Sequence, residues 1–422
     1  MQLVSIGSLI ILLITIVIGF VKKINMGILA LGFSLILGYF GKISINDVIK
    51  GFNSSLFLML VGVSILFGIA QHNGTLNLIV KKLIKLSGKR AWLIPILMYF
   101  VIYLIAFLGA GTITGFAIAA LFGIPMAKEL DTDPFLLTTM GQLGSIGGGI
   151  VPWAPTGIIG IELAKNANIT GNIANTMVIN TFLATAFAAI ISYIFLKGYK
   201  LKAKELNAEI LKFNKNQKIT LVGILFMVVG VAFFNLNIGL LSILLSIILI
   251  LLKVGTEKEA LGSVPWNTIL LISGMGILMD LIVKLDGIKL LADILSLFMN
   301  SKTVAAILAL SSGILSLFSS TSGVVMPTMI PTIPRIIQTL GIENIVPSAL
   351  LLSAVINGSS PSGMSPLSTG GAFVMATLSE NYELTSEEFS SKFKKLFYIT
   401  MLNMFIVAIF ILIGGFSFTK YM

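Results

Sequence analysis

The sequence predicts an all-α polytopic membrane protein made of two inverted-topology repeats. Three observations lead to this prediction: the composition, the spacing of long apolar runs, and the likeness of the two halves. The chain has 422 residues, of which 56% are hydrophobic and 11% charged, and its mean hydropathy is +1.03. A soluble domain carries about 25% charged residues. A water-soluble globular protein is therefore excluded.

The apolar runs define the expected spans and the expected domains. A transmembrane helix needs about 20 apolar residues, and the chain has room for ten or more. Residues 3–21 have no basic stretch before them and are followed by Lys22 and Lys23, so we interpret them as a first span and not as a signal peptide. We divide the chain into a first repeat at 1–197, a basic cytoplasmic linker at 198–218 and a second repeat at 219–422.

Matching residues recur in the two halves at a nearly constant offset. Asn25-Met-Gly27 matches Asn237-Ile-Gly239, Asn53 matches Asn267, and Gly62 is paired with Gly276, at offsets of 212 to 214. An ordered series of this kind predicts an internal repeat. Each repeat is expected to hold about five transmembrane helices, a re-entrant hairpin and an interfacial helix.

The basic residues orient the repeats. With the N-terminus outside, 20 of the 28 Lys and Arg residues are cytoplasmic, including the 198–218 linker, and 8 are outside. This agrees with the positive-inside rule. Each half then crosses the membrane an odd number of times, so the second half is inverted. Inverted repeats around a midplane site are typical of secondary transporters.

Two further segments recur in both halves. Residues 75–90 place apolar side chains on one side and lysines on the other, which predicts a helix lying in the interface, with 288–300 as its counterpart. Residues 91–127 and 303–334 could each be two full spans or one re-entrant hairpin. Charge counting does not decide between these alternatives, because both leave the topology unchanged.

Glycine, proline and hydroxyl residues interrupt the apolar text at 109–115, 147–157, 319–323 and 357–370. Such backbone is tolerated at membrane depth only where it lines a cavity or packs inside protein. Unwound carbonyls and hydroxyls are hard ligands for an alkali cation, and the N-termini of half-helices suit a carboxylate. The candidate substrate-binding residues are Thr112, Thr114, Pro155, Thr156, Thr321, Ser322, Ser365 and Thr369. The candidate cation-binding residues are Gly111, Thr112, Gly148, Ser320, Ser322 and Asn357.

Other function classes find no support in the residues. The chain has no cysteine and one histidine, and it lacks a P-loop, an H-E-x-x-H motif and a G-x-S-x-G motif, so we expect no enzyme, no cofactor and no metal beyond Na⁺ as a coupling ion. The basic residues flank spans, which argues against a nucleic-acid partner. Asp280 is the one acid well inside a span, and Lys284, four residues on, can pair with it.

At the interrupted segments the sequence resembles the ion transporter superfamily, and within it the MatC-type dicarboxylate (malonate) carriers. It is more distantly similar to the divalent anion:sodium symporters, whose hairpin tips carry a Ser-Asn-Thr motif that contacts sodium and the substrate carboxylate. The tips here read Gly111-Thr-Ile-Thr114 and Ser320-Thr-Ser322, so the hydroxyls are kept and the Asn is missing from both. The resemblance covers essentially the whole chain. It implies a moving core of hairpins and broken helices, and a scaffold that offers a surface for a homodimer.

We therefore expect a secondary active transporter of a small carboxylate, a C3 or C4 dicarboxylate, in the cytoplasmic (inner) cell membrane, working by cation-coupled alternating access. Three alternatives remain at this point. An ion antiporter of the same superfamily would carry an intramembrane acid in its core. A membrane subunit of a binding-protein-dependent uptake system would be encoded beside a binding protein. A lipid-modifying enzyme would show acidic or histidine clusters at a cytoplasmic face.

Overall fold

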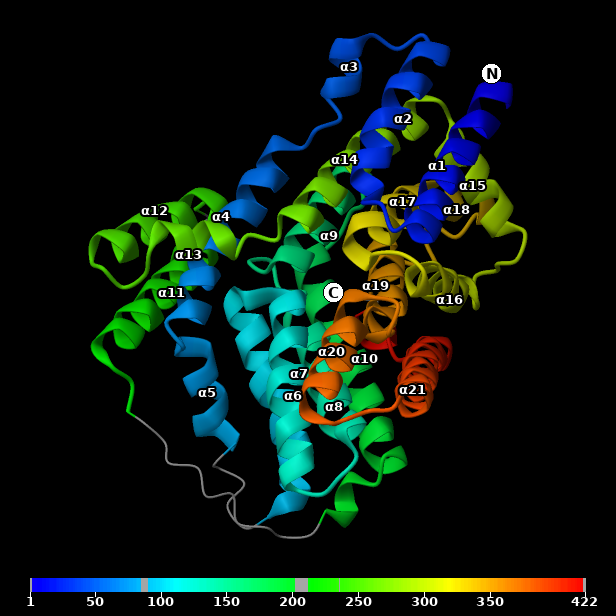
Figure 1. Cartoon of the computed structure of the whole chain (residues 1–422). Helices are drawn as coiled ribbons and strands as arrows, with labels where there is room; N and C mark the ends of the chain where they lie inside the picture. The colour runs from blue at the N-terminus through cyan, green and yellow to red at the C-terminus, as the bar shows by residue number, and fades with distance from the viewer. Residues whose placement is uncertain (1, 85–89, 202–211, 235, 420–422) are drawn as a thin grey trace.

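A computed structural model of the chain describes residues 2–84, 90–201, 212–234 and 236–419, and all regular structure in these ranges is helical (Figure 1). The first half contains α1 (Gln2–Lys22), α2 (Met26–Phe40), α3 (Ile45–Ile49), α4 (Ser54–His72), α5 (Thr75–Ile84), α6 (Ile94–Ile105), α7 (Gly111–Glu129), α8 (Pro134–Gly148), α9 (Pro155–Asn166) and α10 (Ile173–Phe195). The second half contains α11 (Lys215–Phe234), α12 (Ile238–Leu251), α13 (Glu257–Gly262), α14 (Trp266–Lys284), α15 (Gly287–Ser296), α16 (Val304–Leu317), α17 (Met326–Met329), α18 (Ile333–Leu340), α19 (Ser348–Ser359), α20 (Thr369–Asn381) and α21 (Ser386–Leu412).

The two halves repeat the same order of helices, as the predicted fold class requires. Helices α1 to α5 correspond to α11 to α15, the hairpin α6–α7 to the segment α16–α18, and α8 to α10 correspond to α19 to α21. Residues 202–211 of the predicted linker lie outside the described residues, and α11 already begins at Lys215. Residues 85–89 of the predicted interfacial helix also lie outside them; the described part of that helix is α5.

The halves are joined by two equivalent crossings. A Cβ added at Gly27 of α2 would overlap the Leu270 carbonyl of α14, and one added at Gly62 of α4 would overlap the Gly239 carbonyl of α12. A Cβ added at Gly274 would in turn overlap the Gly27 carbonyl, so Gly274 packs on Gly27 as Gly62 packs on Gly239. The structural counterpart of Gly62 is therefore Gly274 and not Gly276. The offsets from Gly27 to Gly239 and from Gly62 to Gly274 are then both 212 residues. Close backbone contact through small residues is how helices pack in lipid.

The segment 91–129 folds back on itself as a helical hairpin. Tyr99 of α6 packs on Gly144 of α8 and Tyr103 packs on Gly148, so α6 and α8 run parallel. Helix α7 runs antiparallel to α8, and its Ala119 packs on Gly141. Helices α6 and α7 are therefore antiparallel. The second hairpin bends by 120° between α16 and the segment Thr321–Leu340. Both segments therefore fold back on themselves, an arrangement that two full spans and a re-entrant hairpin share.

The described residues include six helical segments that are long and apolar enough to cross a membrane, one of which is the folded-back segment 91–129, and a seventh if the bent pair at 304–340 is counted as one. Other apolar runs form shorter helices: α2 has 15 residues and α12 has 14. At 1.5 Å per residue these reach about 22 Å, less than the roughly 30 Å hydrocarbon core. Helices α8 and α9, and likewise α19 and α20, are the halves of two broken helices.

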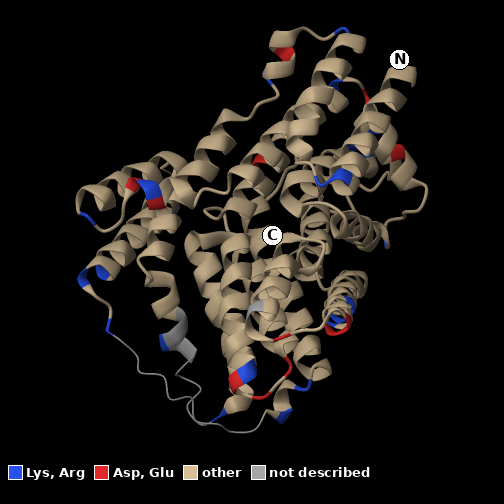
Figure 2. Ribbon diagram, viewed as in Figure 1, with Lys and Arg blue, Asp and Glu red and all other residues tan. Residues whose placement is uncertain are grey.

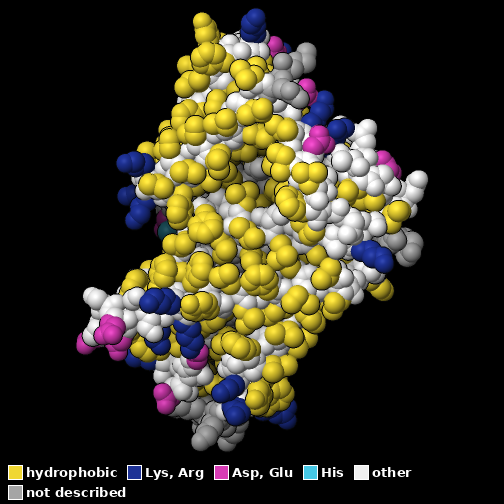
Figure 3. Space-filling view, turned by 90° about the vertical axis from the view of Figure 1, so that its right-hand side faces the viewer, with side chains coloured by type: hydrophobic (Ala, Val, Ile, Leu, Met, Phe, Trp, Pro, Cys, Tyr) yellow, Lys and Arg dark blue, Asp and Glu magenta, His cyan; other side chains and the backbone are white. Residues whose placement is uncertain are grey.

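The outer surface is apolar over wide areas. Large hydrophobic side chains such as Leu3, Phe233 and Leu251 are more than three-quarters exposed. Figure 3 shows one face covered by such side chains, and Figure 2 shows the charged residues gathered at helix ends and loops, with few on the central helices. An apolar exterior with charged ends is suited to lipid.

Candidate functional site

The tip of the first hairpin is held against the break between α8 and α9. Gly109 and Gly111 have φ angles of 117° and 77°, which glycine adopts without the strain that a Cβ would bring. A Cβ at Gly111 would press on Pro155 at the start of α9. Trp153, in the break, donates from Nε1 to the Phe107 carbonyl at 2.6 Å. These contacts place the tip beside the N-terminus of α9.

Hydroxyl side chains of the hairpin tip, α8 and α9 contact one another at this junction. Thr112 Oγ1 lies 3.2 Å from Thr156 Oγ1, and Ser145 of α8 donates to the Thr112 carbonyl at 2.8 Å. All three residues are buried or half-buried. The contacts join the hairpin, the first broken helix and the start of α9 into one polar cluster.

An inner cavity of about 430 Å³ opens at this cluster. Six of the predicted site residues line it: Gly111, Thr112, Thr114, Pro155, Thr156 and Ser322. Ser322 comes from the second hairpin, so the structure brings together the two tips, which lie about 208 residues apart in the sequence. None of the described residues that line this cavity is charged.

The other predicted site residues lie away from the inner cavity. Thr321 donates to the Ser359 carbonyl at 3.0 Å and lies 2.8 Å from Ser316 Oγ, while Ser320 accepts from the Gly323 amide. The six predicted residues that do not line it are Gly148, Ser320, Thr321, Asn357, Ser365 and Thr369.

The remaining four of those six residues lie elsewhere in the structure. Gly148 packs on the Tyr103 carbonyl. Asn357 is buried and donates to Thr181 at 3.0 Å, and its Oδ1 has no hydrogen-bond partner among the described residues. Ser365 is buried and accepts from the Leu367 amide, and Thr369 is exposed at the start of α20.

Regular helices supply polar lining that sequence reasoning missed. Ser64 of α4, Thr268 of α14 and Thr377 of α20 also line the inner cavity. Neither Ser64 nor Thr268 lies in one of the four segments that glycine, proline and hydroxyl residues interrupt together, so the sequence analysis did not select them. Only the packing of α4 and α14 against the hairpin places them here.

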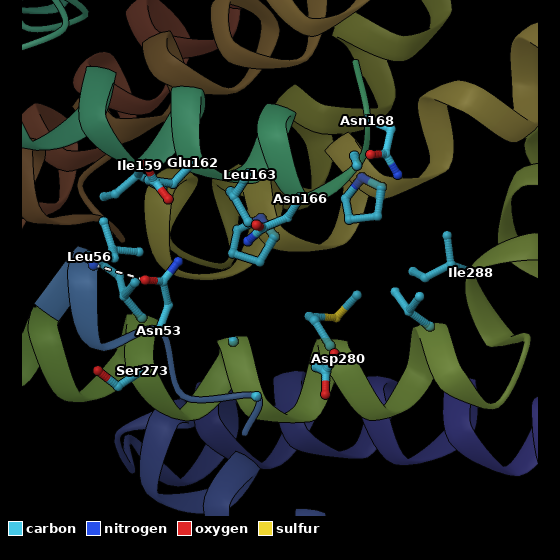
Figure 4. A pocket seen from close by; sticks show the side chains of 18 of the residues that line it. Asn53, Leu56, Ile159, Glu162, Leu163, Asn166, Asn168, Ser273, Asp280 and Ile288 are labelled. Atoms are coloured by element: carbon cyan, nitrogen blue, oxygen red, sulfur yellow. Dashed lines mark hydrogen bonds between the residues drawn. The ribbon is translucent and has the colours of Figure 1, made fainter. Parts of the chain in front are cut away.

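Figure 4 shows part of a larger outer cavity of about 1040 Å³. It adjoins the inner cavity, because Leu60, Ile159 and Ile272 line both. The lining of the outer cavity includes the exposed residues Asn166, Asn168 and Gln338, so it opens to the surface. It also carries charged side chains. One of them, Arg335 of α18, donates from Nε and Nη2 to Asp293 of α15 at 2.8 and 3.2 Å, and these hydrogen bonds lower the pKa of Asp293.

Comparisons with known proteins agree with this architecture. Residues 1–149 match the family model of the dicarboxylate carrier protein MatC N-terminus. No curated protein sequence matches the chain. Among solved structures, the chain is similar to the YdaH transporter of Alcanivorax borkumensis, with a TM-score of 0.57, 12% sequence identity, and coverage of 87% of this chain and 88% of that one. At this identity the likeness shows the fold alone.

The match over residues 1–149 confirms the resemblance to the MatC-type carriers, and the shared fold extends over most of the chain. Both the family model and the solved structure describe transport proteins, so the comparisons point to transport and not to catalysis. The chain is therefore a multi-pass membrane protein with a transporter fold, and its residues 1–149 are similar to the MatC dicarboxylate carriers.

Proposed function

We propose that the protein is a secondary active transporter that takes up a small carboxylate, a C3 or C4 dicarboxylate, across the inner cell membrane by Na⁺-coupled alternating access. The observation that carries the proposal is the uncharged inner cavity in which hydroxyls from both hairpin tips meet. The match to a dicarboxylate carrier family supports the substrate class.

Two helix N-termini support recognition of an anion. Helices α7 and α9 both begin at this cavity, with Gly111 and Thr112 in the first turn of one and Pro155 and Thr156 in the first turn of the other. Neither helix has a side-chain cap. The free amides and the positive ends of two helix dipoles therefore face the same space, where they favour a carboxylate.

The same cavity motivates coupling to Na⁺. A dianion that leaves water for an uncharged cavity loses hydration energy, and a bound cation offsets part of this loss. The hydroxyls of Thr112, Thr114 and Ser322 are hard oxygen donors. Because no titratable side chain of the described residues lines the inner cavity, a proton has no group to occupy there.

The test is uptake of labelled malonate, succinate and malate into proteoliposomes of the purified chain, with Na⁺ and pH gradients imposed separately. We expect saturable uptake of at least one dicarboxylate, driven by the Na⁺ gradient. Absence of uptake and exchange of all three acids would contradict the substrate class. Uptake driven by a pH gradient in Na⁺-free medium would contradict the choice of ion, and its loss in Asp280→Asn would assign the proton to that residue.

A further inference from the structure

The outer cavity contains five charged residues among those that line it. They are Lys50, Glu162, Asp280, Lys289 and Arg335. The inner cavity has none among its described lining residues. An anion that travels between the outer opening and the hairpin tips therefore meets all of its charged contacts in the outer cavity.

Four of these five residues have an ion-pair partner. The pairs are Lys50 with Asp47 at 2.7 Å, Asp280 with Lys284 at 2.6 Å, Lys289 with Asp286 at 2.5 Å, and Arg335 with Asp293 at 2.8 Å. The contact between Asp280 and Lys284 lacks hydrogen-bond alignment. Each pair joins opposite charges, so these four residues add little net charge to the cavity wall.

Glu162 of α9 is the exception. It is half-buried, and it has no ion pair or hydrogen bond within the described ranges. Lys165, three residues on, is exposed and does not pair with it. Figure 4 shows the Glu162 side chain directed from α9 into the cavity, on the wall that faces Asn53 and Leu56. The wall therefore carries one unbalanced negative charge, at Glu162.

Helix α9 places this charge on the path between the two cavities. Its first turn, with Thr156, lines the inner cavity; Ile159 lines both cavities; Glu162 and Asn166 line the outer one. These residues are spaced by three or four positions, so they share one face of the helix. Glu162 lies one turn beyond Ile159, which lines both cavities.

We propose that the coupling cation neutralises the Glu162 carboxylate when it passes through the outer cavity with a dicarboxylate, before both reach the hydroxyls of the inner cavity. The inference rests on the proposed function, since it requires an anionic substrate. A carboxylate beside a low-dielectric wall repels a dianion, and bound Na⁺ or H⁺ removes that repulsion. Ionisable groups that face a transport path are expected to act in this way.

The other charged groups around the cavity do not take this role. Helix α14 contributes Asp280 with Lys284, α15 contributes Lys289 and Asp293, α18 contributes Arg335, and the segment before α4 contributes Lys50. All of them are held in ion pairs. A cation that binds at Asp280 would have to displace Lys284, whereas Glu162 is available without breaking a contact.

The test compares wild type, Glu162→Gln and Glu162→Asp in proteoliposomes, with Glu343→Gln as the matched control, because Glu343 is exposed and does not line the cavity. Three rates are measured for the same labelled dicarboxylate. They are exchange against unlabelled substrate without a gradient, uptake driven by a Na⁺ gradient at constant pH, and uptake driven by a pH gradient without Na⁺.

We expect Glu162→Gln to keep exchange and to lose stimulation by whichever gradient drives the wild type, while Glu162→Asp and Glu343→Gln keep both. The gradient that is lost identifies the cation as Na⁺ or H⁺. Gradient stimulation that persists in Glu162→Gln overturns the inference and leaves the proposed function intact, as does equal loss of exchange and driven uptake. A wild type that exchanges no dicarboxylate overturns the proposed function and the inference with it.

Discussion

At the scale of the residue, the inner cavity depends on hydroxyl groups that contact one another across helices. Thr112 faces Thr156 at 3.2 Å, and its carbonyl accepts from Ser145. The second tip is arranged differently: Thr321 is turned inward to Ser316 and Ser359, and Ser322 faces the cavity. The two tips therefore offer unequal sets of donors, although their sequences are similar.

Replacing Thr114 or Ser322 by Ala should weaken substrate binding while expression stays at the wild-type level. Loss of a buried hydrogen-bonding partner costs roughly 1–3 kcal/mol, so the apparent KM should rise about 5- to 150-fold. The measurement is the concentration dependence of uptake in proteoliposomes. Ser55→Ala, at an exposed hydroxyl of α4 that does not line the cavity, should leave KM unchanged. Wild-type kinetics in both cavity variants would remove these residues from the site.

Thr321→Ala tests whether Thr321, unlike Ser322, stabilises the second hairpin and does not bind substrate. Thr321 hydrogen-bonds within its own hairpin and to the Ser359 carbonyl, so its loss should lower the thermal stability of the purified protein more than it raises KM. Thermal unfolding in detergent and uptake kinetics on the same preparation give both values. A rise in KM as large as that of Ser322→Ala, with unchanged stability, would place Thr321 among the substrate contacts.

At the scale of the element, helices approach closely wherever glycine removes a side chain. The crossings of α2 with α14 and of α4 with α12 bring backbones together at Gly27 and Gly62, and no larger residue fits there. Along α8, Gly144 and Gly148 do the same for the first hairpin. In lipid, where apolar surface alone does not drive association, such close packing holds helices together.

Gly27→Ala should destabilise the folded protein, because the new Cβ would overlap backbone atoms of α14 that cannot rotate away. Overpacking of this kind costs typically 1–3 kcal/mol, and more where backbone must shift. The matched control is Gly32→Ala on the same helix, where the added Cβ meets nothing within 4 Å. It should be neutral or slightly stabilising, since Ala favours a helix over Gly by about 1 kcal/mol. Equal midpoints of thermal unfolding in detergent for the two variants would refute this account of the crossing.

At the scale of the whole molecule, two cavities meet at Leu60, Ile159 and Ile272. These residues come from α4, α9 and α14, so both repeats contribute to the boundary. With the proposed orientation, the outer cavity with Lys50 and Lys289 lies toward the outside, and Gln71 places the inner cavity toward the cytoplasm. Movement of one bundle against the other would open the hairpin tips to each side in turn.

The orientation itself is tested by cysteine labelling, since the chain has no cysteine of its own. We expect a cysteine at Asn214 to resist an impermeant reagent added to intact cells and to react once the membrane is opened. A cysteine at Lys50, on the proposed outer side, should react in both conditions. Labelling of Asn214→Cys from outside would reverse the topology.

The sequence by itself determined the class of the molecule, because the exclusion of charge from long apolar runs leaves a lipid-embedded helical fold as the consistent solution. It also showed the repeat, through paired positions such as Gly27 and Gly239, and it marked the hairpin tips by their interruptions. These properties are local or recur at a constant spacing, so they are visible along the chain.

Only the tertiary structure decided which marked residues meet. Thr321 and Ser322 are adjacent in the sequence, yet one is tied within its hairpin and the other faces the cavity. Ser64 and Thr268 line the inner cavity although neither lies in an interrupted segment, and the packing of Gly274 on Gly27 identified Gly274 as the counterpart of Gly62. Glu162 lies one residue beyond an uncharged stretch and becomes notable only because the other charges around it are paired. Contacts between segments more than 100 residues apart depend on the rotation of each helix, which composition and spacing leave undetermined.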